Sequence, residues 1–479
     1  MSSNESEAVE GCALRAMREV LQAVGVEEGA GGPVSIDGGD FPRLGPLRLA
    51  SANAGAMAAH ATGLAAWWKL RGGGTQSMRI NAGRAVQSLR SFLFMRHNGY
   101  PLDVEAHNAV SGFHRTGDGR WVCISAYEPH FMGPTLELLQ ALNTHQAVDA
   151  ALAKWKGEDF EAAMAKIRVP CAVVRPEAEW LAHPQGQWLS QLPIVEIEKL
   201  GASPPEPPKP VQPGALTRPL AGLRVLEFTH VLCGPMTGRF LAEHGSDNLR
   251  VVSPRRPDTQ MVAFDTGWGK RTTLADFRRA EDMARLQQLV REGDIIVQSH
   301  RPGALERHGL SAAEAARLRP GIIYVSVSCF GDSGPWRERG GYDPIAQSAS
   351  GVCHTETFEG TPRQGRTLTI NDYLTAYLAA AGVMSALLRR AREGGSYHVK
   401  VSLTRSSMWL QSLGLLPGVE RYAHLPYENP LPPLMTTRAT PFGMISSLSP
   451  AMEYSATPPY WERPCEPAGA SMPVWLPRD

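Results

Sequence analysis

The stretch GLRVLEFTHVLCGPMTGRFLAEHG, from Gly222 to Gly245, decides the fold class. Its first part, GLRVLEF, is a short apolar run typical of a buried strand. GPMTGRFLAEHG follows as a turn and a helix, for which Gly245 is the predicted C-cap. The next strand is NLRVVSP, and two further helical segments lead into DIIVQS and IIYVSVSCFG. This alternation predicts an α/β fold, with a parallel sheet that has helices on both faces.

Length and composition limit the class of protein. A chain of 479 residues predicts two or three domains, and 43% hydrophobic with 20% charged residues is ordinary globular usage. With 48 Lys and Arg against 47 Asp and Glu, no general basic field favours nucleic acid or an anionic membrane. We expect no membrane span and no secretory signal, because long apolar runs are missing and the N-terminus MSSNESEAVEG is polar and acidic.

The cysteines and histidines predict a reduced compartment and no metal. The seven cysteines are scattered and form no C-x-x-C pair, which favours a cytoplasmic location over a disulfide framework or a zinc site. The fourteen histidines show no spacing typical of metal ligands.

The Pro-rich stretch SPPEPPKPVQP, from Ser203 to Pro213, predicts an extended spacer between two parts of the chain. We expect the Pro-rich tail after Trp409 to wrap over other elements and to bury its Trp, Tyr and Phe side chains. The predicted division is an N-terminal helical or irregular segment (1–44), a helix-turn-strand segment (45–105), a small α+β domain (106–202), a Pro-rich linker (203–217), the α/β core (218–410) and a Pro-rich irregular tail (411–479).

The two parts of the chain contain an internal echo. KLRGGGTQSMRINAGRAV (69–86) resembles RRAREGGSYHVKVSLTRSS (389–407), and an Ala-rich helix precedes each segment. When the Gly-Gly turns are superposed, Ser51 falls opposite Asp372, so the first copy lacks this carboxylate. Chance similarity of two helix-turn-strand units is the alternative.

Three loop ends of the predicted sheet carry groups that suit a phosphorylated ligand. The junction THVLCGPMTGR places a helix N-terminus after a strand, QSHRPGALERHG carries Arg301 and Arg307, and GKRTTL carries Lys270 and Arg271. An ordinary loop or a solvated basic face explains each segment equally well alone. Together they are able to converge on one ligand. The missing G-x-G-x-x-G and G-x-S-x-G patterns disfavour a dinucleotide enzyme and an α/β serine hydrolase.

Asp372, in LTINDYLTAYLAAAG, directly precedes a long apolar helix. One interpretation is a helix N-cap. The other is a held carboxylate that serves as the nucleophile of covalent acyl transfer, with the helix N-terminus stabilising the anion.

The motifs from PLAGLRVLEFTHVLCGP through YDPIAQSASG to NDYLTAYLAAAGVMSALL resemble, in order, the core of the family III CoA transferases. The N-terminal part resembles the small domain that normally follows this core, so the order of the domains is rearranged. The resemblance implies a Rossmann-like large domain with a smaller α+β domain, an interlocked homodimer with one functional aspartate per subunit, and an acyl-CoA substrate with a carboxylic acid acceptor.

The resemblance also implies roles for single residues. Asp372 matches the catalytic aspartate, which attacks the thioester and carries the acyl group. The residues that match positions around CoA are His230, Leu232, Cys233, Lys270, Arg271, Ser299, Arg307 and Tyr342. Ser299 stands where an Asn is common, Ala376 replaces the usual Gly, and VVSP lacks the usual acidic residue.

Two alternatives remain within this resemblance. An α-methylacyl-CoA racemase shares the fold and the aspartate but uses a histidine base, where this chain has Tyr342, a poor base at neutral pH. A non-catalytic acyl-CoA-binding subunit would bind CoA without acyl transfer. A nucleotide-dependent oxidoreductase rests only on the alternation of strands and helices.

Overall fold

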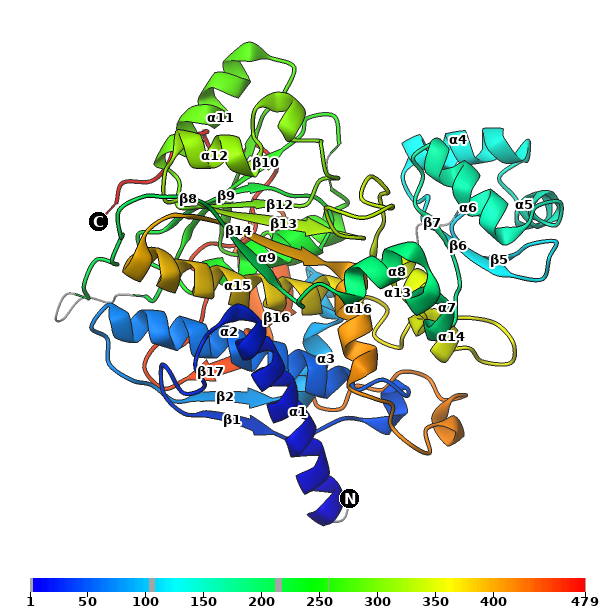
Figure 1. Cartoon of the computed structure of the whole chain (residues 1–479), viewed down its shortest axis with the longest axis horizontal. Coiled ribbons are helices and arrows are strands. Elements are labelled where there is room, and N and C mark those ends of the chain that lie inside the picture. The colour runs from blue at the N-terminus through cyan, green and yellow to red at the C-terminus, as the bar shows by residue number, and fades with distance from the viewer. Residues whose placement is uncertain (1–2, 103–107, 212–217, 257, 479) are drawn as a thin grey trace.

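A computed structural model describes residues 3–102, 108–211, 218–256 and 258–478, and its centre is a seven-stranded sheet (Figure 1). In the order of the sheet the strands are β11 (Lys270–Leu274), β10 (Asp247–Val252), β9 (Arg224–Phe228), β12 (Ile295–Gln298), β13 (Ile323–Ser328), β14 (Ser396–Ser402) and β8 (Glu196–Gly201). Neighbouring strands pair in parallel, except that β8 is antiparallel to β14.

The parallel strands follow the doubly wound order. Numbered along the chain from β9 to β14, they lie in the order 3-2-1-4-5-6. In sheets of this order, ligands generally bind outside the carboxyl ends of the strands, at the point where the order reverses. That reversal falls between β9 and β12. The prediction of a mixed α/β fold with helices and a multi-stranded sheet is confirmed.

Helices cover both faces of this sheet (Figure 1). Their bounds are α9 (Cys233–Ala242), α10 (Gln260–Thr266), α11 (Ala280–Glu292), α12 (Ala312–Leu318), α13 (Asp343–Ser350), α14 (Val352–Thr355), α15 (Asn371–Glu393) and α16 (Leu403–Ser412). Side chains alternate along each strand, so Val225 and Val297 pack in the core with α9 and α15, whereas Leu226 and Ile296 pack with α11 and α12.

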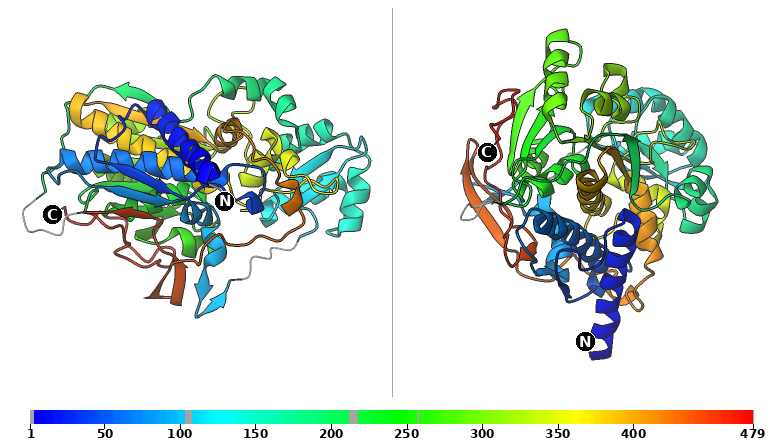
Figure 2. Two further views of the ribbon diagram at one scale, coloured as in Figure 1. Left: turned by 90° about the horizontal axis from the view of Figure 1, so that it is seen from below. Right: turned by 60° about the vertical axis from the view of Figure 1, so that its left-hand side comes forward.

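The N-terminal part folds against the open side of α15 (Figure 2). It consists of α1 (Ser3–Val24), β1 (Val34–Asp37), α2 (Leu49–Leu70), β2 (Met78–Asn81) and α3 (Ala82–Ser88). β1 and β2 are parallel, and β17 (Met452–Tyr454) adds an antiparallel strand beside β2. The structure therefore has helix, turn and strand in both segments of the predicted echo.

The small domain contains an antiparallel three-stranded sheet with helices. Its strands are β5 (Gly112–Arg115), β6 (Trp121–Ile124) and β7 (Cys171–Val173), and its helices are α4 (Pro129–Leu139), α5 (His145–Leu152) and α6 (Gly157–Lys166). The chain then returns through α7 (Glu177–Ala182) and α8 (Pro184–Ser190) to β8. Thus β8, which we assigned to the small domain, belongs to the large sheet, where it covers the edge of β14.

The described part of the Pro-rich linker, residues 203–211, lies against the large domain. Glu206 forms an ion pair with Arg319, and the backbone N–H of Val211 donates to the Arg71 carbonyl at 2.8 Å. Residues 212–217 of the predicted linker lie outside the described residues. The described part of the linker has no helix or strand of its own, so contacts with other elements hold it in place.

The tail is more regular than predicted. It forms β15 (Met435–Thr440) and β16 (Gly443–Leu448), and β16 pairs with β3 (Arg96–His97), which pairs with β4 (Tyr100–Pro101). Trp461 and Trp475 are buried, as expected, whereas Tyr460 is half exposed. Strands form because the tail finds unpaired edges in the N-terminal part.

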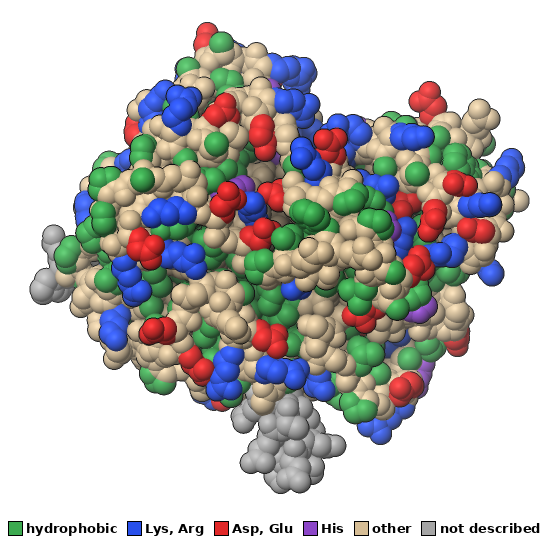
Figure 3. All heavy atoms as spheres, in the orientation of Figure 1, with side chains coloured by type: hydrophobic (Ala, Val, Ile, Leu, Met, Phe, Trp, Pro, Cys, Tyr) green, Lys and Arg blue, Asp and Glu red, His purple; other side chains and the backbone are tan. Residues whose placement is uncertain are grey.

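The surface carries mixed charge. On the face shown in Figure 3, acidic and basic side chains are interspersed without a large patch of one sign. Within the described ranges, no helix has the length and apolar character needed to cross a membrane.

Candidate functional site

Asp372 is the second residue of α15 and not its N-cap. The N-cap position is Ile370, whose side chain makes no capping hydrogen bond. The backbone N–H of Asp372 is instead satisfied by a carboxylate oxygen, Asp343 Oδ2, at 2.8 Å. The N-cap interpretation is therefore wrong, because a carboxylate from a different helix takes over the capping role.

Asp343 is held on several sides, and the sequence analysis missed it. Gln347 Nε2 donates to its Oδ1 at 2.6 Å, and Asn371 Nδ2 donates to the same atom at 3.2 Å. Ser407 Oγ in turn donates to Asn371 Oδ1 at 2.9 Å. Its place directly after Tyr342 in GGYDPI was the available signal, but its bond to Asp372 spans 29 residues.

The carboxyl group of Asp372 is almost completely buried. The residue is 8% exposed. Burial raises the pKa of Asp372 well above its usual range, the charge of nearby Asp343 raises it further, and a hydrogen bond from the Cys233 backbone N–H opposes the shift. Burial also raises the pKa of Asp343 to about 6, against the hydrogen bonds that favour its anion.

Cys233 opens α9, so the carboxyl group of Asp372 meets the N-terminus of that helix. The predicted role of a helix N-terminus at this carboxylate thus falls to α9, whose free N–H groups follow the end of β9. Cys233 and Leu232 are both buried beneath the loop.

The loop between β9 and α9 is tied to its neighbours. The backbone N–H of His230 donates to Ser299 Oγ at 3.1 Å, and His230 Nε2 lies 3.1 Å from Asp258 Oδ1. Val231 has φ of 64°, a left-handed conformation that costs energy for a β-branched residue, and its N–H donates to Asp258. The structure therefore brings His230, Ser299 and the Asp372 helix end to one edge of the sheet.

The small domain reaches across this edge. Tyr342 Oη donates to Glu128 Oε1 at 3.4 Å, and Arg256 Nη2 lies 3.0 Å from Glu128 Oε2. Arg301 Nη2 donates to the Arg168 carbonyl at 2.8 Å. These contacts join the small domain to two loops of the large sheet and to the start of α13.

The predicted basic residues are not all free to meet a ligand. Arg307 is exposed and donates to the Gly303 carbonyl, so most of its guanidinium faces solvent. Lys270 is fully buried, and its Nζ lies 2.7 Å from Glu227 Oε2. Arg271 is paired with Asp247 at 2.9 Å. Lys270 and Arg271 are thus already neutralised by carboxylates of the same sheet, buried Glu227 and half-buried Asp247, so their place around CoA stays a prediction that would require an exchange of partners.

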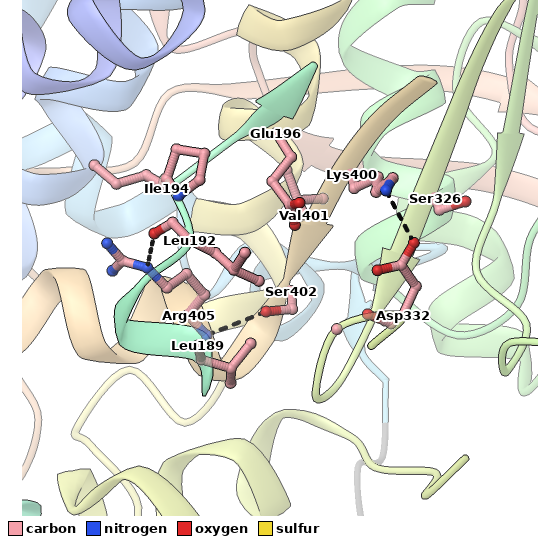
Figure 4. Close-up of a pocket in the computed structure, with 13 residues that line it drawn as sticks. Leu189, Leu192, Ile194, Glu196, Ser326, Asp332, Lys400, Val401, Ser402 and Arg405 are labelled. Atoms are coloured by element: carbon pink, nitrogen blue, oxygen red, sulfur yellow. Dashed lines mark hydrogen bonds and ion pairs between the residues drawn. The ribbon is translucent and has the colours of Figure 1, made fainter. Parts of the chain in front are cut away.

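A separate pocket lies where β8 begins and β13 and β14 end, at the far side of the sheet from β11 (Figure 4). Lys400 Nζ is 3.0 Å from Glu198 Oε2 and 3.3 Å from Asp332 Oδ2, and Arg405 Nε donates to the Leu192 carbonyl. Asp372 does not line this pocket. Of its lining residues, Lys400 is paired with Asp332, and the pocket is a different place from the surroundings of Asp372.

The geometry around Asp372 suits covalent chemistry on a carboxyl group. A buried carboxylate is poorly solvated and therefore a stronger nucleophile, and an N–H group at a helix N-terminus can stabilise negative charge that develops there. Among the residues that the structure describes, no group of His, Cys, Asp or Glu is arranged to hold a metal ion.

Comparison with known proteins gives a match to one family model. The model of CoA-transferase family III matches residues 220–421. A protein named acetyl-coenzyme A transferase nodX, from Hypoxylon pulicicidum, is 34% identical over 252 residues, which are 50% of this chain and 42% of that protein. Succinyl-CoA--D-citramalate CoA-transferase of Chloroflexus aurantiacus is 30% identical over 220 residues, 43% of this chain and 54% of the relative.

Among solved structures, a CAIB/BAIF family protein from Brucella suis is 26% identical, covers 48% of this chain and 65% of that chain, and has a TM-score of 0.37. The chain spans about half the length of the curated relatives that it matches.

Proposed function

We propose that this chain, whose residues 220–421 match CoA-transferase family III, moves CoA from an acyl-CoA thioester to a carboxylic acid acceptor, with Asp372 as the nucleophile. The observation that carries the proposal is the enclosed carboxyl group of Asp372 at the N-terminus of α9, on the edge of the sheet where ligands collect.

The proposed reaction is a series of acyl transfers through Asp372. The Asp372 carboxylate attacks the thioester carbonyl, which forms a mixed anhydride and releases CoA thiolate. The thiolate attacks the aspartyl carbonyl, which forms an aspartyl thioester and frees the first acid. The acceptor carboxylate attacks this thioester, and the released thiolate then takes the new acyl group and restores Asp372.

The loops around Asp372 give this cycle a place for CoA. Arg307 is an exposed cation that suits a phosphate, and the loop from His230 to Cys233 leads into α9, whose first N–H group bonds the Asp372 carboxyl group. Arg256 already pairs with Glu128 of the small domain, so it would bind phosphate only by exchanging that partner.

Tyr342 favours transfer over racemisation. Burial raises the pKa of Tyr342 above its usual range, and the carboxylate of Glu128 raises it further. A phenol that is harder to ionise is a weaker base at neutral pH, so it is a poor replacement for the histidine of a racemase.

The proposal is tested by exchange. The protein is incubated with single acyl-CoA thioesters and a panel of free acids, and new acyl-CoA species are followed by mass spectrometry. We expect exchange with wild type and with the control variant Asp159→Asn, which changes an exposed side chain of α6. We expect no exchange with Asp372→Asn, whose circular dichroism should equal that of wild type. Wild-type exchange in Asp372→Asn would exclude this residue as the nucleophile. Binding of CoA without exchange by wild type would favour a non-catalytic subunit.

A further inference from the structure

Two units of this chain share one plan. In the first, β1 is parallel to β2 and α2 leads into β2; in the second, β13 is parallel to β14 and α15 leads into β14. Each then turns into a short helix with the same cap: Asn81 accepts from the N–H of Arg84, and Ser402 accepts from the N–H of Arg405.

The carboxylate that supports the start of α15 also has a counterpart. Asp40 Oδ1 accepts from the backbone N–H of Ser51 at 2.9 Å, as Asp343 Oδ2 accepts from that of Asp372 at 2.8 Å. Ser51 Oγ donates to the second oxygen of Asp40. The first unit therefore keeps the supporting aspartate and has a serine in place of the candidate nucleophile.

The two long helices meet through equivalent residues. The shift that places Ser51 opposite Asp372 also places Gly63 opposite Met384, and a Cβ atom built on Gly63 would lie 2.7 Å from Met384 Cβ. Earlier in the same helices, His60 meets the Ala380 backbone, so α2 and α15 run in the same direction. Contact between equivalent residues marks a twofold axis in an isologous interface.

The segment that follows each unit bonds to the segment that precedes the long helix of the other unit. The Leu89 carbonyl, after α3, accepts from Thr369 Oγ1 before α15; the N–H of Leu416, after α16, donates to the Pro46 carbonyl before α2. In the same way, a strand that follows each unit joins the sheet of the other unit. β17, which follows the second unit, pairs antiparallel with β2 of the first, and β8, which follows the first unit, pairs antiparallel with β14 of the second.

We propose that this single chain is an interlocked pseudo-dimer, in which the first unit occupies the surface where a second identical subunit would pack. This replaces the homodimer expected from the sequence by an internal one. The partner that fits the α15 surface is thus residues 34–94 of the same chain, so this chain of 52.0 kDa should not pair with a second copy through α15.

The first unit also supports the site of the second. The backbone N–H of Phe92 donates to Tyr373 Oη at 3.1 Å, and Tyr373 Oη donates to Asp265 Oδ2 at 2.7 Å. Tyr373 directly follows Asp372. The element that precedes β1 in the described residues is the helix α1, which packs on α2.

An engineered disulfide tests whether β17 pairs with β2 of the same chain, and it needs no measurement of activity. Arg79 and Glu453 are exposed register partners on β2 and β17, and opposite residues of antiparallel strands lie within disulfide distance. The native cysteines are all buried. We expect Arg79→Cys with Glu453→Cys to oxidise within one chain and to run at monomer mass on a denaturing, non-reducing gel. Either single variant is the control.

Light scattering of the wild type gives the second readout. We expect 52.0 kDa from low to high micromolar concentration. A covalent species of twice that mass from the double variant, or no disulfide at all, would overturn the proposal, as would a wild-type dimer in solution. None of these outcomes depends on whether the protein transfers CoA.

Discussion

Asp372 and Asp343 form a pair of unequal carboxyl groups. Asp343 receives hydrogen bonds from Gln347, Asn371 and the Asp372 backbone, so its anion is the better supported one. Asp372 has burial and the charge of Asp343 against it, and the Cys233 N–H in its favour. In such a pair, the proton stays on Asp372 and a nucleophilic anion forms only as the pH rises.

Replacing Asp343 should therefore change the pH dependence of transfer. Asp343→Asn removes a negative charge, which lowers the pKa of Asp372, so the acidic limb of the rate profile should move to lower pH. The measurement is kcat for CoA exchange against pH, with Asp159→Asn as a control that leaves the limb in place. An unmoved limb in Asp343→Asn would show that Asp343 does not set the ionisation of the nucleophile.

Arg307 should act on binding. Its guanidinium is exposed and, in this proposal, contacts a phosphate far from the thioester, so it contributes equally to ground and transition states. Arg307→Ala should raise KM for the acyl-CoA several-fold with little change in kcat. Arg317→Ala, an exposed arginine of α12, is the matched control. A KM equal to that of wild type would remove Arg307 from the site.

At the scale of single elements, the sequence predicted the strands and helices of the core well. GLRVLEF, DIIVQS and IIYVSVSCFG are strands because their apolar runs are short, and the helices between them carry one apolar face. Asp372 was recognisable because a long apolar helix follows it.

Pairings between distant residues were not predictable. The bond from Asp343 to Asp372 and the pairing of Lys270 with Glu227 connect different elements, and a single sequence does not show which charges meet inside a fold. Lys270 and Arg271 therefore looked like part of a ligand site. β17 was missed for the same reason, since a short strand forms only where an unpaired edge is available.

α9 shows how closely one element depends on such a pairing. A Cβ atom on Gly238 would lie 2.0 Å from Glu227 Oε1, and this same carboxylate neutralises buried Lys270. Burial lowers the pKa of Lys270 to about 8, against the charge of Glu227. The glycine is thus required by a close approach and not by its backbone angles.

Gly238→Ala should destabilise the protein strongly, by about 3 kcal/mol or more, because it displaces a buried ion-pair partner. Gly11→Ala, in α1 with open space around its Cβ, should be neutral or stabilising by up to about 1 kcal/mol. Chemical denaturation of both variants gives the comparison. Equal stability of the two would contradict the packing of α9 on Glu227.

At the scale of the whole molecule, many ionisable groups are buried where the halves of the chain meet. His60 of α2 lies against His244, with ring centroids 5.7 Å apart, and Glu243 precedes His244 in the chain. Burial lowers the pKa of His60 to about 4 and raises that of Glu243 to about 8, although Arg239 and Arg218 oppose the second shift. The interface between the two units therefore prefers neutral side chains.

Because Glu243 is buried and prefers its neutral form, its ionisation should make the stability of the protein depend on pH. Its folded pKa lies above the ordinary value, so the folded protein holds a proton that the unfolded chain has released, and the stability present at low pH is lost as the pH rises through about 8. Glu243→Gln keeps the shape and removes the charge. Relative to wild type, its Tm should be similar near pH 5 and should become increasingly higher toward pH 8.5.

Comparing two variants isolates this effect from other titrating groups. Glu462→Gln, at an exposed position, is the matched control and should follow wild type at every pH, because water surrounds this side chain in the folded chain as in the unfolded one. Buried histidines such as His60 influence stability below their ordinary pKa in wild type and in both variants, so they cancel in the difference. If the Tm difference between Glu243→Gln and wild type stays constant from pH 5 to 8.5, Glu243 is ionised in the folded protein throughout, and the interface between the two units tolerates a buried charge.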